Sequence, residues 1–314
     1  MDNVSITAII PTLNGGETFR RLLAQLAVQT QAIDELLVID SSSDDTTVSI
    51  AREYGAKVIS IARADFDHGS TRTQAANTGS GNYLLFFTQD AIPENNMLVE
   101  LLLAPLLQDE NVALSYGRQL PNPDASLFAT ALRLFNYPEK SEIRSFADKA
   151  RKGLKTAFVS NSCALYRKKP LAEAGFFEDG LIFGEDTCVA GKLLAAGWKI
   201  AYVAEAAVFH SHNYSIAEEF HRSFDIGVLH HTQSWLLKTY GKAEGEGIKY
   251  VRFELACILK KRKFQLIPIF FCRNLAKISG YKLGNKYYAL PRWLAEKLSM
   301  NKTWWSRNPK KENL

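Results

Sequence analysis

Carboxylates follow several apolar, strand-like segments in the first third of the chain. Asp90 comes directly after the apolar run 83–87, in the sequence FFTQDA, and Asp40 follows the run 36–39. A carboxylate in this position either caps the next helix or serves as a ligand at the open edge of a sheet. Ligands of open parallel sheets bind beyond the carboxyl ends of the strands. We therefore expect Asp40, Asp90 and Thr12, which follows the first apolar segment, to border one crevice.

The stretch DFDHGSTRTQ carries groups that suit an anion. Arg72 is a fixed cation near the start of a predicted helix, and His68 and Gly69 precede it. A guanidinium and the backbone N–H groups of a helix N-terminus both favour phosphate oxygens. A contact to a diphosphate is one interpretation, and a solvated arginine on the helix surface is the other. No GK[ST] or GxGxxG pattern follows the first strand, which argues against a P-loop and a dinucleotide oxidoreductase.

Glu185 and Asp186 open another predicted helix, in FGEDTCVAGKLLAAG. Carboxylates are electrostatically favoured at any helix N-terminus, so stabilisation of the helix is the simpler interpretation. Gly184 and several phenylalanines precede the pair, which indicates a pocket wall where a carboxylate acts as general base.

Two histidines provide a candidate metal site. His210 and His212 lie two residues apart after a strand-like segment, so both side chains can point to one face. Packing at the surface or in the core is the alternative. Metal ligation fits if Asp90 lies nearby, because a divalent ion that bridges phosphates needs few protein ligands.

These side chains must be positioned by alternating strands and helices. Short connections between them predict a parallel sheet with right-handed crossovers, hence an α/β fold. The polar, basic segment 140–155 is expected to be a loop, and from about residue 216 the pattern is helical. In the first third of the chain, strands are expected at 6–10, 36–39, 57–61 and 83–87. Helices are expected at 17–29, from the capping residues 41–45 through residue 54, and at 71–78.

Composition places the chain among folded proteins of a reducing compartment. Its 314 residues, 46% hydrophobic, are enough to bury a substantial core in one large or two modest domains. The four cysteines show no metal-ligand spacing, so buried thiols are expected. The longest apolar run, 264–272, is about half the roughly 20 residues that span a bilayer. With no signal-peptide pattern at the N-terminus, we expect a cytoplasmic protein.

Charge is distributed unevenly along the chain. From Lys249 to the end there are 16 Lys and Arg against 3 Asp and Glu, whereas the preceding part has 22 against 30. Aromatic and aliphatic residues are interspersed with these cations, a composition that suits the headgroup region of an anionic membrane. An ordinary helical subdomain with a solvated basic face, or a homo-oligomer interface, is the alternative. Nucleic acid is not expected as a partner, because no binding motif accompanies the charge.

Four stretches together resemble the family 2 glycosyltransferases. They occur in the family's order within residues 4–235, and the HGxTR stretch and the TQDA ending are most similar to bacterial rhamnosyltransferases of O-antigen and capsule assembly. The resemblance implies a GT-A fold, a Rossmann-like, mostly parallel sheet flanked by helices, over residues 1–235, followed by a basic helical region over 236–314. The stretches are AIIPTLNGGETFRRLLAQLAVQT, ELLVIDSSSDDTT, FDHGSTRTQAANTGSGNYLLFFTQDA and FGEDTCVAGKLLAAGWKIAYVAEAAVFHSH.

The resemblance also implies roles for individual residues. Asp186 would be the general base, with Glu185 beside it in the catalytic pair. Asp90 matches the last acid of the DxD motif, but Thr88 replaces the first, so the need for a divalent cation, Mg²⁺ or Mn²⁺, at Asp90 and His212 stays open. The residues implied to bind the nucleotide-sugar donor are Thr12, Asn14, Asp40, Asp44, His68, Arg72 and Gln89.

The implied reaction is an inverting transfer of L-rhamnose from dTDP-β-L-rhamnose to an undecaprenyl-diphosphate-linked glycan. The enzyme would work as a peripheral protein on the inner face of the bacterial plasma membrane. The processive QxxRW motif is missing, so one sugar per encounter is expected. A UDP-hexose donor is an alternative, and so is a catalytically silent nucleotide-binding scaffold on the membrane, which the threonine in the DxD motif suggests.

Overall fold

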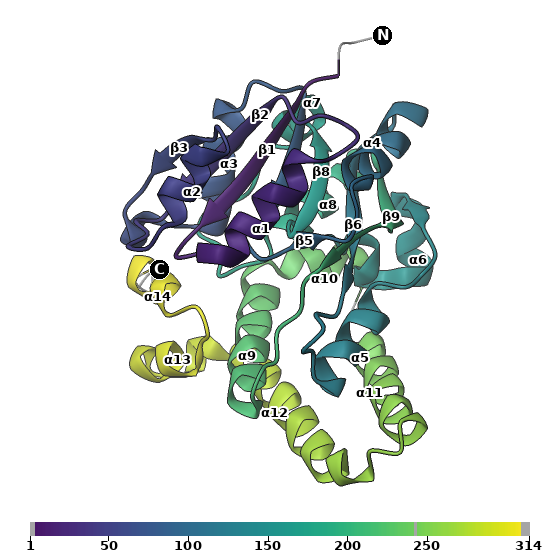
Figure 1. Ribbon diagram of the computed structural model, residues 1–314. Coiled ribbons are helices and arrows are strands. Elements are labelled where there is room, and N and C mark those ends of the chain that lie inside the picture. The colour runs from purple at the N-terminus through teal and green to yellow at the C-terminus, as the bar shows by residue number, and fades with distance from the viewer. Residues whose placement is uncertain (1–3, 242–243, 309–314) are drawn as a thin grey trace.

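The computed structural model describes residues 4–241 and 244–308. A central sheet with helices packed on both faces forms the upper part of Figure 1, and a helical region extends below it. The strands are β1 (Ile6–Thr12), β2 (Glu35–Asp40), β3 (Lys57–Ser60), β4 (Tyr83–Phe87), β5 (Ile92–Pro93), β6 (Val112–Leu120), β7 (Glu142–Arg144), β8 (Cys163–Arg167) and β9 (Lys199–Phe209).

The helices fall into a group that covers the sheet and a group that follows it. The first group is α1 (Gly16–Ala27), α2 (Thr47–Glu53), α3 (His68–Thr78), α4 (Leu98–Gln108), α5 (Leu127–Asn136), α6 (Lys149–Lys152), α7 (Lys168–Glu173) and α8 (Glu185–Ala195). The second group is α9 (Ile216–Thr232), α10 (Ser234–Tyr240), α11 (Glu244–Lys260), α12 (Ile267–Asn285), α13 (Arg292–Leu298) and α14 (Lys302–Arg307).

The first four strands are parallel to one another. The strand order is β3-β2-β1-β4-β8-β6-β9-β5, with β7 also paired to β9. All five residues of β4 are buried, as expected for a strand covered by helices on both faces. The register pairs Thr12 with Asp40 at the carboxyl ends of β1 and β2, so the expected edge is formed.

The remaining strands make the sheet mixed and bring the later motifs to the same edge. β8 is antiparallel to both β4 and β6, whereas β6 and β9 are parallel. The short β5 pairs with the end of β9, Ile92 opposite Phe209. Because β5 begins two residues after Asp90 and β9 ends at Phe209, this pairing places Asp90 beside the two histidines that follow.

The expected loop at 140–155 is wrong, because this segment folds against the sheet. It contains β7, which is antiparallel to β9, and the helix α6. Arg144 fixes it: the buried guanidinium donates to the carbonyls of Lys155 (2.5 Å) and Phe158 (2.7 Å) and to the hydroxyl of Tyr116 (2.9 Å). A basic residue that looked solvent-exposed in sequence is a buried structural donor.

The helical C-terminal region is confirmed and is docked firmly on α9. Glycines allow α12 to approach α9 closely: a Cβ on Gly280 or Gly284 would overlap the carbonyl oxygen of Phe220 or Phe224. Arg273 of α12 is ion-paired with the buried Glu219 of α9. None of the helices within the described ranges is long and apolar enough to cross a bilayer. The division at residue 235 stays a prediction.

After α12 the chain returns to the sheet. In Figure 1, α13 and α14 run back from the helical region to a position below α2 and β3. Asp225 of α9 fixes this return, accepting hydrogen bonds from Ser299 Oγ (2.6 Å) and from the backbone N–H groups of Met300 and Asn301 (3.0 Å each). The last described helix therefore lies against the carboxyl edge of the sheet.

Candidate active site

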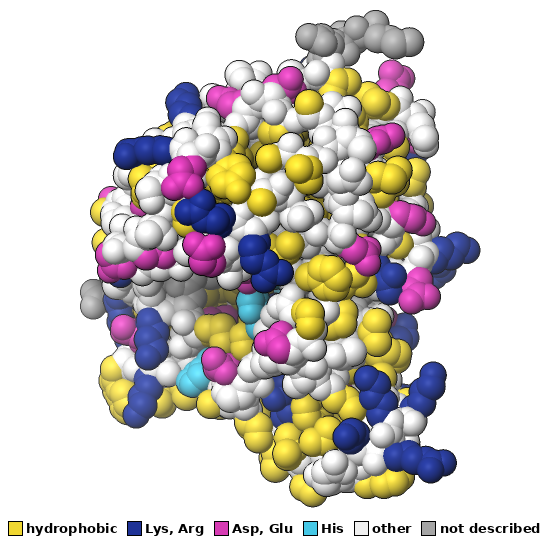
Figure 2. Space-filling model, in the orientation of Figure 1, with side chains coloured by type: hydrophobic (Ala, Val, Ile, Leu, Met, Phe, Trp, Pro, Cys, Tyr) yellow, Lys and Arg dark blue, Asp and Glu magenta, His cyan; other side chains and the backbone are white. Residues whose placement is uncertain are grey.

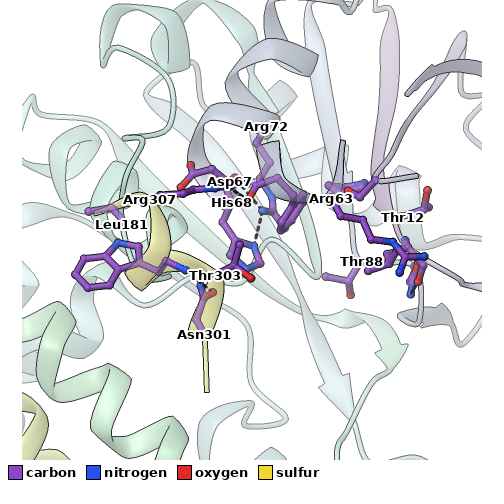
Figure 3. A pocket seen from close by; sticks show the side chains of 16 residues that line it. Thr12, Arg63, Asp67, His68, Arg72, Thr88, Leu181, Asn301, Thr303 and Arg307 are labelled. Carbon is purple, nitrogen blue, oxygen red and sulfur yellow. Dashed lines mark hydrogen bonds between the residues drawn. The ribbon is translucent and has the colours of Figure 1, made fainter. Parts of the chain in front are cut away.

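Two pockets lie at the carboxyl edge of the sheet. The first, of about 420 Å³, is lined by Thr12, Thr88 and Gln89 at one end and by His68 and Arg72 nearer its middle (Figure 3). The C-terminal segment forms its other end (Figure 3). The second, of about 510 Å³, contains Asp186, His210 and His212. Of the predicted site residues, Thr12, His68, Arg72 and Gln89 line the first pocket and Asp186 and His212 line the second, whereas Asn14, Asp40, Asp44, Asp90 and Glu185 line neither.

Asp40 organises the loops around the first pocket. Its buried carboxylate accepts hydrogen bonds from Thr12 Oγ1 (3.2 Å), Ser43 N (2.9 Å) and Ser43 Oγ (2.5 Å). The Ser43 hydroxyl accepts from Asn14 N (2.9 Å), and Asn14 Oδ1 accepts from Asp44 N (3.0 Å). Asp40 therefore shapes the rim, and its oxygens are already used within the protein.

Two further predicted donor-binding residues lie on the same rim. Asp44 is exposed and forms an ion pair with Arg63 (3.1 Å). Gln89 clamps the end of β1, because its amide accepts from Leu13 N (2.9 Å) and donates to Leu13 O (3.0 Å). The ion pair joins the loop after β2 to the segment after β3, and the Gln89 contacts join the segment after β1 to the one after β4.

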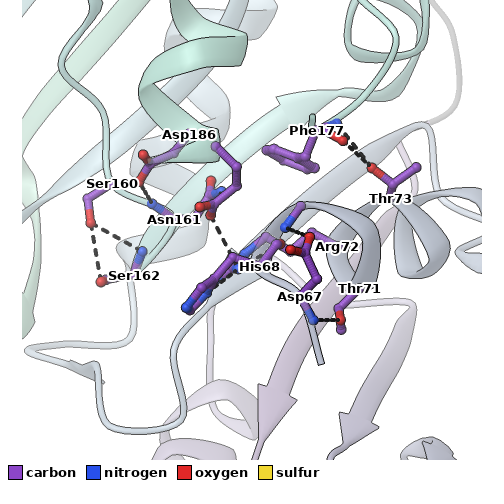
Figure 4. Close-up of polar contacts among 12 residues, drawn as sticks. Asp67, His68, Thr71, Arg72, Thr73, Ser160, Asn161, Ser162, Phe177 and Asp186 are labelled. Atoms are coloured by element: carbon purple, nitrogen blue, oxygen red, sulfur yellow. Dashed lines mark hydrogen bonds and ion pairs between the residues drawn. The ribbon is translucent and has the colours of Figure 1, made fainter. Parts of the chain in front are cut away.

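Arg72 joins the second half of the chain to the first (Figure 4). Its Nη1 lies 3.2 Å from Glu185 Oε1 and donates to the carbonyl of His68 (3.0 Å), and both charged side chains are buried. Asp67 caps α3 by accepting from Gly69 N and Ser70 N. Burial lowers the pKa of His68, so the imidazole that faces the first pocket is neutral near neutral pH. Of the two interpretations of Arg72, the solvated arginine on the helix surface is wrong, because the guanidinium is buried at the wall of the first pocket.

Glu185 and Asp186 have different environments although they are adjacent. Burial raises the pKa of Glu185, but Arg72 and His68 outweigh it and the net pKa is lowered. Burial and then the charge of Glu185 raise the pKa of Asp186 to about 7. Asp186 accepts from Asn161 N (3.2 Å) and lines the second pocket, which suits a general base. Glu185 instead forms an ion pair with Arg72, and its role is to hold this arginine and to raise the pKa of Asp186.

Gly184 allows the turn that presents this pair. It has φ +81°, in the left-handed region, and a Cβ there would lie 2.7 Å from Leu229 Cδ2 of α9. Only glycine meets both conditions without strain. The start of α8 is therefore held by α9, an interaction that the sequence did not indicate.

Asp90, His210 and His212 form a group that could hold a metal ion. Their ligand atoms lie within 4.8 Å of one another, with Asp90 Oδ1 3.4 Å from His210 Nδ1 and Oδ2 3.9 Å from His212 Nε2. Burial raises the pKa of Asp90, but the histidines outweigh it and bring it to about 2. Burial lowers the pKa of His212 to about 4, which leaves its nitrogen lone pair free. A carboxylate with neutral imidazole suits a divalent ion.

Two polar atoms near Asp90 that make no hydrogen bond of good geometry support this fit. Thr88 Oγ1 and His210 Nδ1 are buried and form no such bond among the described residues, although His210 Nδ1 lies 3.4 Å from Asp90 Oδ1. Such atoms are rare in folded proteins and are explained where a ligand satisfies them. His210 was considered in the sequence with His212 but not selected as a ligand, and its spacing of two after β9 was the available signal.

The sequence did not indicate that the C-terminal segment takes part in the first pocket. Asn301, Thr303, Trp304 and Arg307 line it, more than 200 residues away from the motifs on the opposite wall. No local pattern predicts such a contact, because it depends on the docking of α12 and on Asp225.

With this geometry the chain can be compared with known proteins. The model of Glycosyl transferase family 2 matches residues 7–175, so the chain belongs to this family and is a glycosyltransferase. It is 41% identical over 304 residues to the O-antigen chain rhamnosyltransferase WbaN of Salmonella anatum, with 96% of each chain covered. The O-antigen chain rhamnosyltransferase RfbN of Salmonella typhimurium is also 41% identical, over 305 residues and with the same coverage.

Solved structures share the fold. The mannosyltransferase PcManGT of Pyrobaculum calidifontis, solved with GDP-Man and Mn²⁺, superimposes with a TM-score of 0.58 at 14% identity, covering 99% of this chain and 88% of that one. TarS 1–349 of S. aureus, solved with UDP-GlcNAc, gives 0.54 at 14% identity, covering 90% and 91%. The predicted α/β class and GT-A architecture are thereby confirmed.

Proposed function

We propose that the protein transfers L-rhamnose from dTDP-β-L-rhamnose to a lipid-linked oligosaccharide in the synthesis of O-antigen or capsule. The choice of sugar is supported by two relatives, 41% identical over 96% of the chain, whose names describe O-antigen chain rhamnosyltransferases. The observation that carries the reaction type is Asp186, a carboxyl with a raised pKa in a pocket adjacent to the Asp90 group.

The donor binds in the first pocket, with the thymine and deoxyribose at the rim that Asp40 and Asp44 shape. The buried Arg72 lies behind the diphosphate, where its charge, shared with Glu185, favours the anion. Asp90, His210 and His212 would hold a divalent cation, which supplies positive charge to the diphosphate leaving group.

The acceptor occupies the second pocket, where Asp186 removes the proton of its attacking hydroxyl. That oxygen attacks the anomeric carbon opposite the bond to dTDP, in a single displacement that forms one C–O bond and breaks the other. Configuration inverts, so a β-linked donor gives an α-L-rhamnoside. Glu185 keeps Arg72 and α8 in place, so that Asp186 faces the acceptor.

The acceptor is a glycan on undecaprenyl diphosphate, presented at an anionic membrane on the cytoplasmic side. This partner is supported by the hairpin of α11 and α12, on which Figure 2 shows Lys and Arg gathered around hydrophobic side chains at the lower right. A lipid-linked substrate requires its enzyme at the surface, and such a composition suits a headgroup layer.

A donor screen tests the proposal. Purified protein is given dTDP-β-L-rhamnose, UDP-glucose or UDP-GlcNAc, each with Mg²⁺, Mn²⁺ or EDTA, and release of the nucleoside diphosphate is measured. We expect turnover with the dTDP donor, less turnover in EDTA, and a large loss in Asp90→Ala at every metal concentration. Turnover with a UDP donor alone would replace the proposed sugar by a UDP-hexose.

The alternative of a catalytically silent scaffold predicts that the proposed catalytic and metal-binding carboxylates are dispensable. It requires that Asp186→Asn and Asp90→Asn leave function intact, measured as complementation of O-antigen synthesis in a strain that lacks the gene. We expect both variants to fail while they accumulate to the wild-type level.

A further inference from the structure

We propose that Arg307 of the C-terminal helix α14 binds the diphosphate of the donor, an inference that rests on the proposed function in taking the first pocket as the nucleotide site. The motifs that resemble the family all lie before residue 235. Arg307 lies in the last described turn of the chain, at the other end of the pocket.

The position of Arg307 is set by contacts on both sides. Its Nη1 donates to the carbonyl of Phe66, next to the cap of α3. Thr303 and Arg307 line the same pocket as Thr12 and Thr88, and Figure 3 shows Arg307 on the side of the view away from those two threonines. The guanidinium is therefore placed at the pocket wall and is not a free surface side chain.

The second terminal nitrogen of Arg307 has no partner. Nη2 is buried and makes no hydrogen bond among the described residues. Leaving a buried charged donor unsatisfied is costly, so its retention at a pocket wall indicates a ligand that accepts from it. A phosphate oxygen fits, because a guanidinium binds anions with two parallel donors.

The balance of charges in the first pocket also supports an anionic ligand at Arg307. The pocket is lined by three arginines, and two of them have carboxylate partners: Arg63 pairs with Asp44, and Arg72 pairs with Glu185. Within residues 4–241 and 244–308, Arg307 forms no ion pair with a carboxylate. Of the three arginines, Arg307 is therefore the one whose charge no carboxylate among the described residues balances, and it adds to the attraction that Arg72 exerts on an anionic ligand.

The C-terminal segment is held well enough to present this charge. Trp304 Nε1 donates to the carbonyl of Gly180 (2.7 Å), and Asn301 Nδ2 donates to that of Ile182 (2.6 Å). Trp305 is buried against the main core, and Asp225 binds the start of the segment. Ordering before the ligand arrives lowers the entropic cost of binding it.

The test compares nucleotides that differ only in phosphate number. Binding of dTDP, dTMP and UDP to the full chain is measured by calorimetry for wild type, Arg307→Gln, Arg307→Lys and the control Lys302→Gln. Lys302 is exposed on the same helix and does not line the pocket, so its loss removes one charge without removing the contact. Melting temperatures report folding of each variant.

We expect Arg307→Gln to weaken dTDP binding by about 10- to 100-fold, the effect of one hydrogen bond to a charged group. Binding of dTMP should change much less, Arg307→Lys should be intermediate, and Lys302→Gln should match wild type. An unchanged ratio of dTDP to dTMP affinity in a folded Arg307→Gln protein would overturn the inference.

The remaining outcomes separate this inference from the proposed donor. If wild type binds UDP but not dTDP, the proposed sugar donor fails, and the loss of UDP binding in Arg307→Gln still decides the role of Arg307. If wild type binds neither diphosphate, both are overturned. If Arg307→Gln does not fold, the Arg307→Lys variant is the test, because lysine keeps the charge but lacks two parallel donors. An unchanged ratio of dTDP to dTMP affinity in Arg307→Lys would then count against the inference.

Discussion

The two adjacent carboxyl groups at the start of α8 have pKa values that their neighbours shift in opposite directions. Glu185 faces a buried arginine and stays ionised, whereas Asp186 faces a pocket and is raised in pKa by burial and by Glu185. A base with a pKa near the working pH combines a useful ionised fraction with a strong affinity for the proton. By keeping Glu185 ionised, the ion pair with Arg72 also helps to raise the pKa of Asp186.

The rate of transfer should therefore depend on the ionisation of Asp186. Because only the carboxylate form accepts a proton, kcat/KM should fall as the pH drops through about 7 and level off above it. Asp186→Asn should lower kcat by about 10²- to 10⁴-fold at every pH and leave nucleotide affinity unchanged. The measurement is a pH–rate profile with saturating donor.

The matched control for this profile is Asp179→Asn, an exposed aspartate in the segment before α8. It should reproduce the wild-type curve. A profile that stays flat from pH 6 to 8 in wild type, or an Asp186→Asn protein that is as active as the control, would contradict the role of Asp186 as base.

The unpaired hydroxyl of Thr88 gives a second prediction. Thr88→Val replaces a buried oxygen without a partner by a methyl group of similar size, so the melting temperature should not fall. If the hydroxyl contributes to the cation and diphosphate site, the rise in melting temperature on adding Mn²⁺ with dTDP should be smaller than in wild type. Both quantities come from one set of thermal melts.

Thr156→Val is the control, because Thr156 Oγ1 is also buried and unpaired but lines neither pocket. Its ligand-induced shift should equal that of wild type. Equal shifts in all three proteins would show that Thr88 takes no part in binding.

The sequence predicted the sheet edge at which these residues gather better than it predicted how they interact. Asp40 and Asp90 follow strands, and the parallel register places them at one edge, which is a local rule. The pairing of Arg72 with Glu185 depends on where α8 lies relative to α3, and a single sequence does not contain that distance. His210 needed the pairing of β5 with β9 before its proximity to Asp90 could be seen.

Among the helices, the contact between α9 and α12 determines where the C-terminal region lies. Gly227 on α9 and Gly280 and Gly284 on α12 bring the two backbones together, since a Cβ at any of them would overlap main-chain atoms of the other helix. Helices pack this closely only where side chains are absent from the contact. The helical pattern of both segments was visible in the sequence, but the meaning of these glycines was not.

Gly280→Ala should therefore destabilise the protein. The overlap with the carbonyl of Phe220 forces α12 away from α9, and overpacking of this kind costs about 1–3 kcal/mol. Denaturant unfolding of wild type and variant measures the difference. Because α12 leads to α14, nucleotide binding should weaken as well.

Gly245→Ala serves as the control, because Gly245 lies in α11 and a Cβ added there would meet no atom within 4 Å. An exposed glycine in a helix is about 1 kcal/mol less favourable than alanine, so this variant should be slightly more stable than wild type. If both variants have the same stability, close packing is not what the glycine provides.

At the scale of the whole molecule, the cationic C-terminal region serves more than one purpose. Arg273 and Lys277 are used inside the fold, where they lie near the buried carboxylates Glu219 and Glu254. Arg307 lines the first pocket. The charge counted along the sequence is therefore larger than the charge available to a membrane, and removal of the whole region would also remove a wall of the first pocket.

The surface available to a membrane is instead an exposed apolar row on α12 beside the basic turn after α11. Phe271 and Leu275 are 63% and 68% exposed, and Ile278 continues the row one turn later. Lys260, Lys261, Arg262 and Lys263 lie at the turn and are exposed. Apolar groups that enter the headgroup layer and cations at about 1 kcal/mol each near an anionic surface act together.

Phe271→Ser with Leu275→Ser should therefore reduce sedimentation with phosphatidylglycerol-containing vesicles, and Lys261→Gln with Lys263→Gln should do so mainly at low salt, because screening removes the electrostatic part. Turnover of a water-soluble acceptor should be unchanged in both double variants, since these residues lie outside the two pockets. Val28→Ser with Leu107→Ser, which alters two similarly exposed residues on the sheet domain, should bind vesicles like wild type. If all variants sediment alike while Phe271→Ser with Leu275→Ser converts a dimer to a monomer in light scattering, the row on α12 is an interface between two copies of the chain and not a membrane surface.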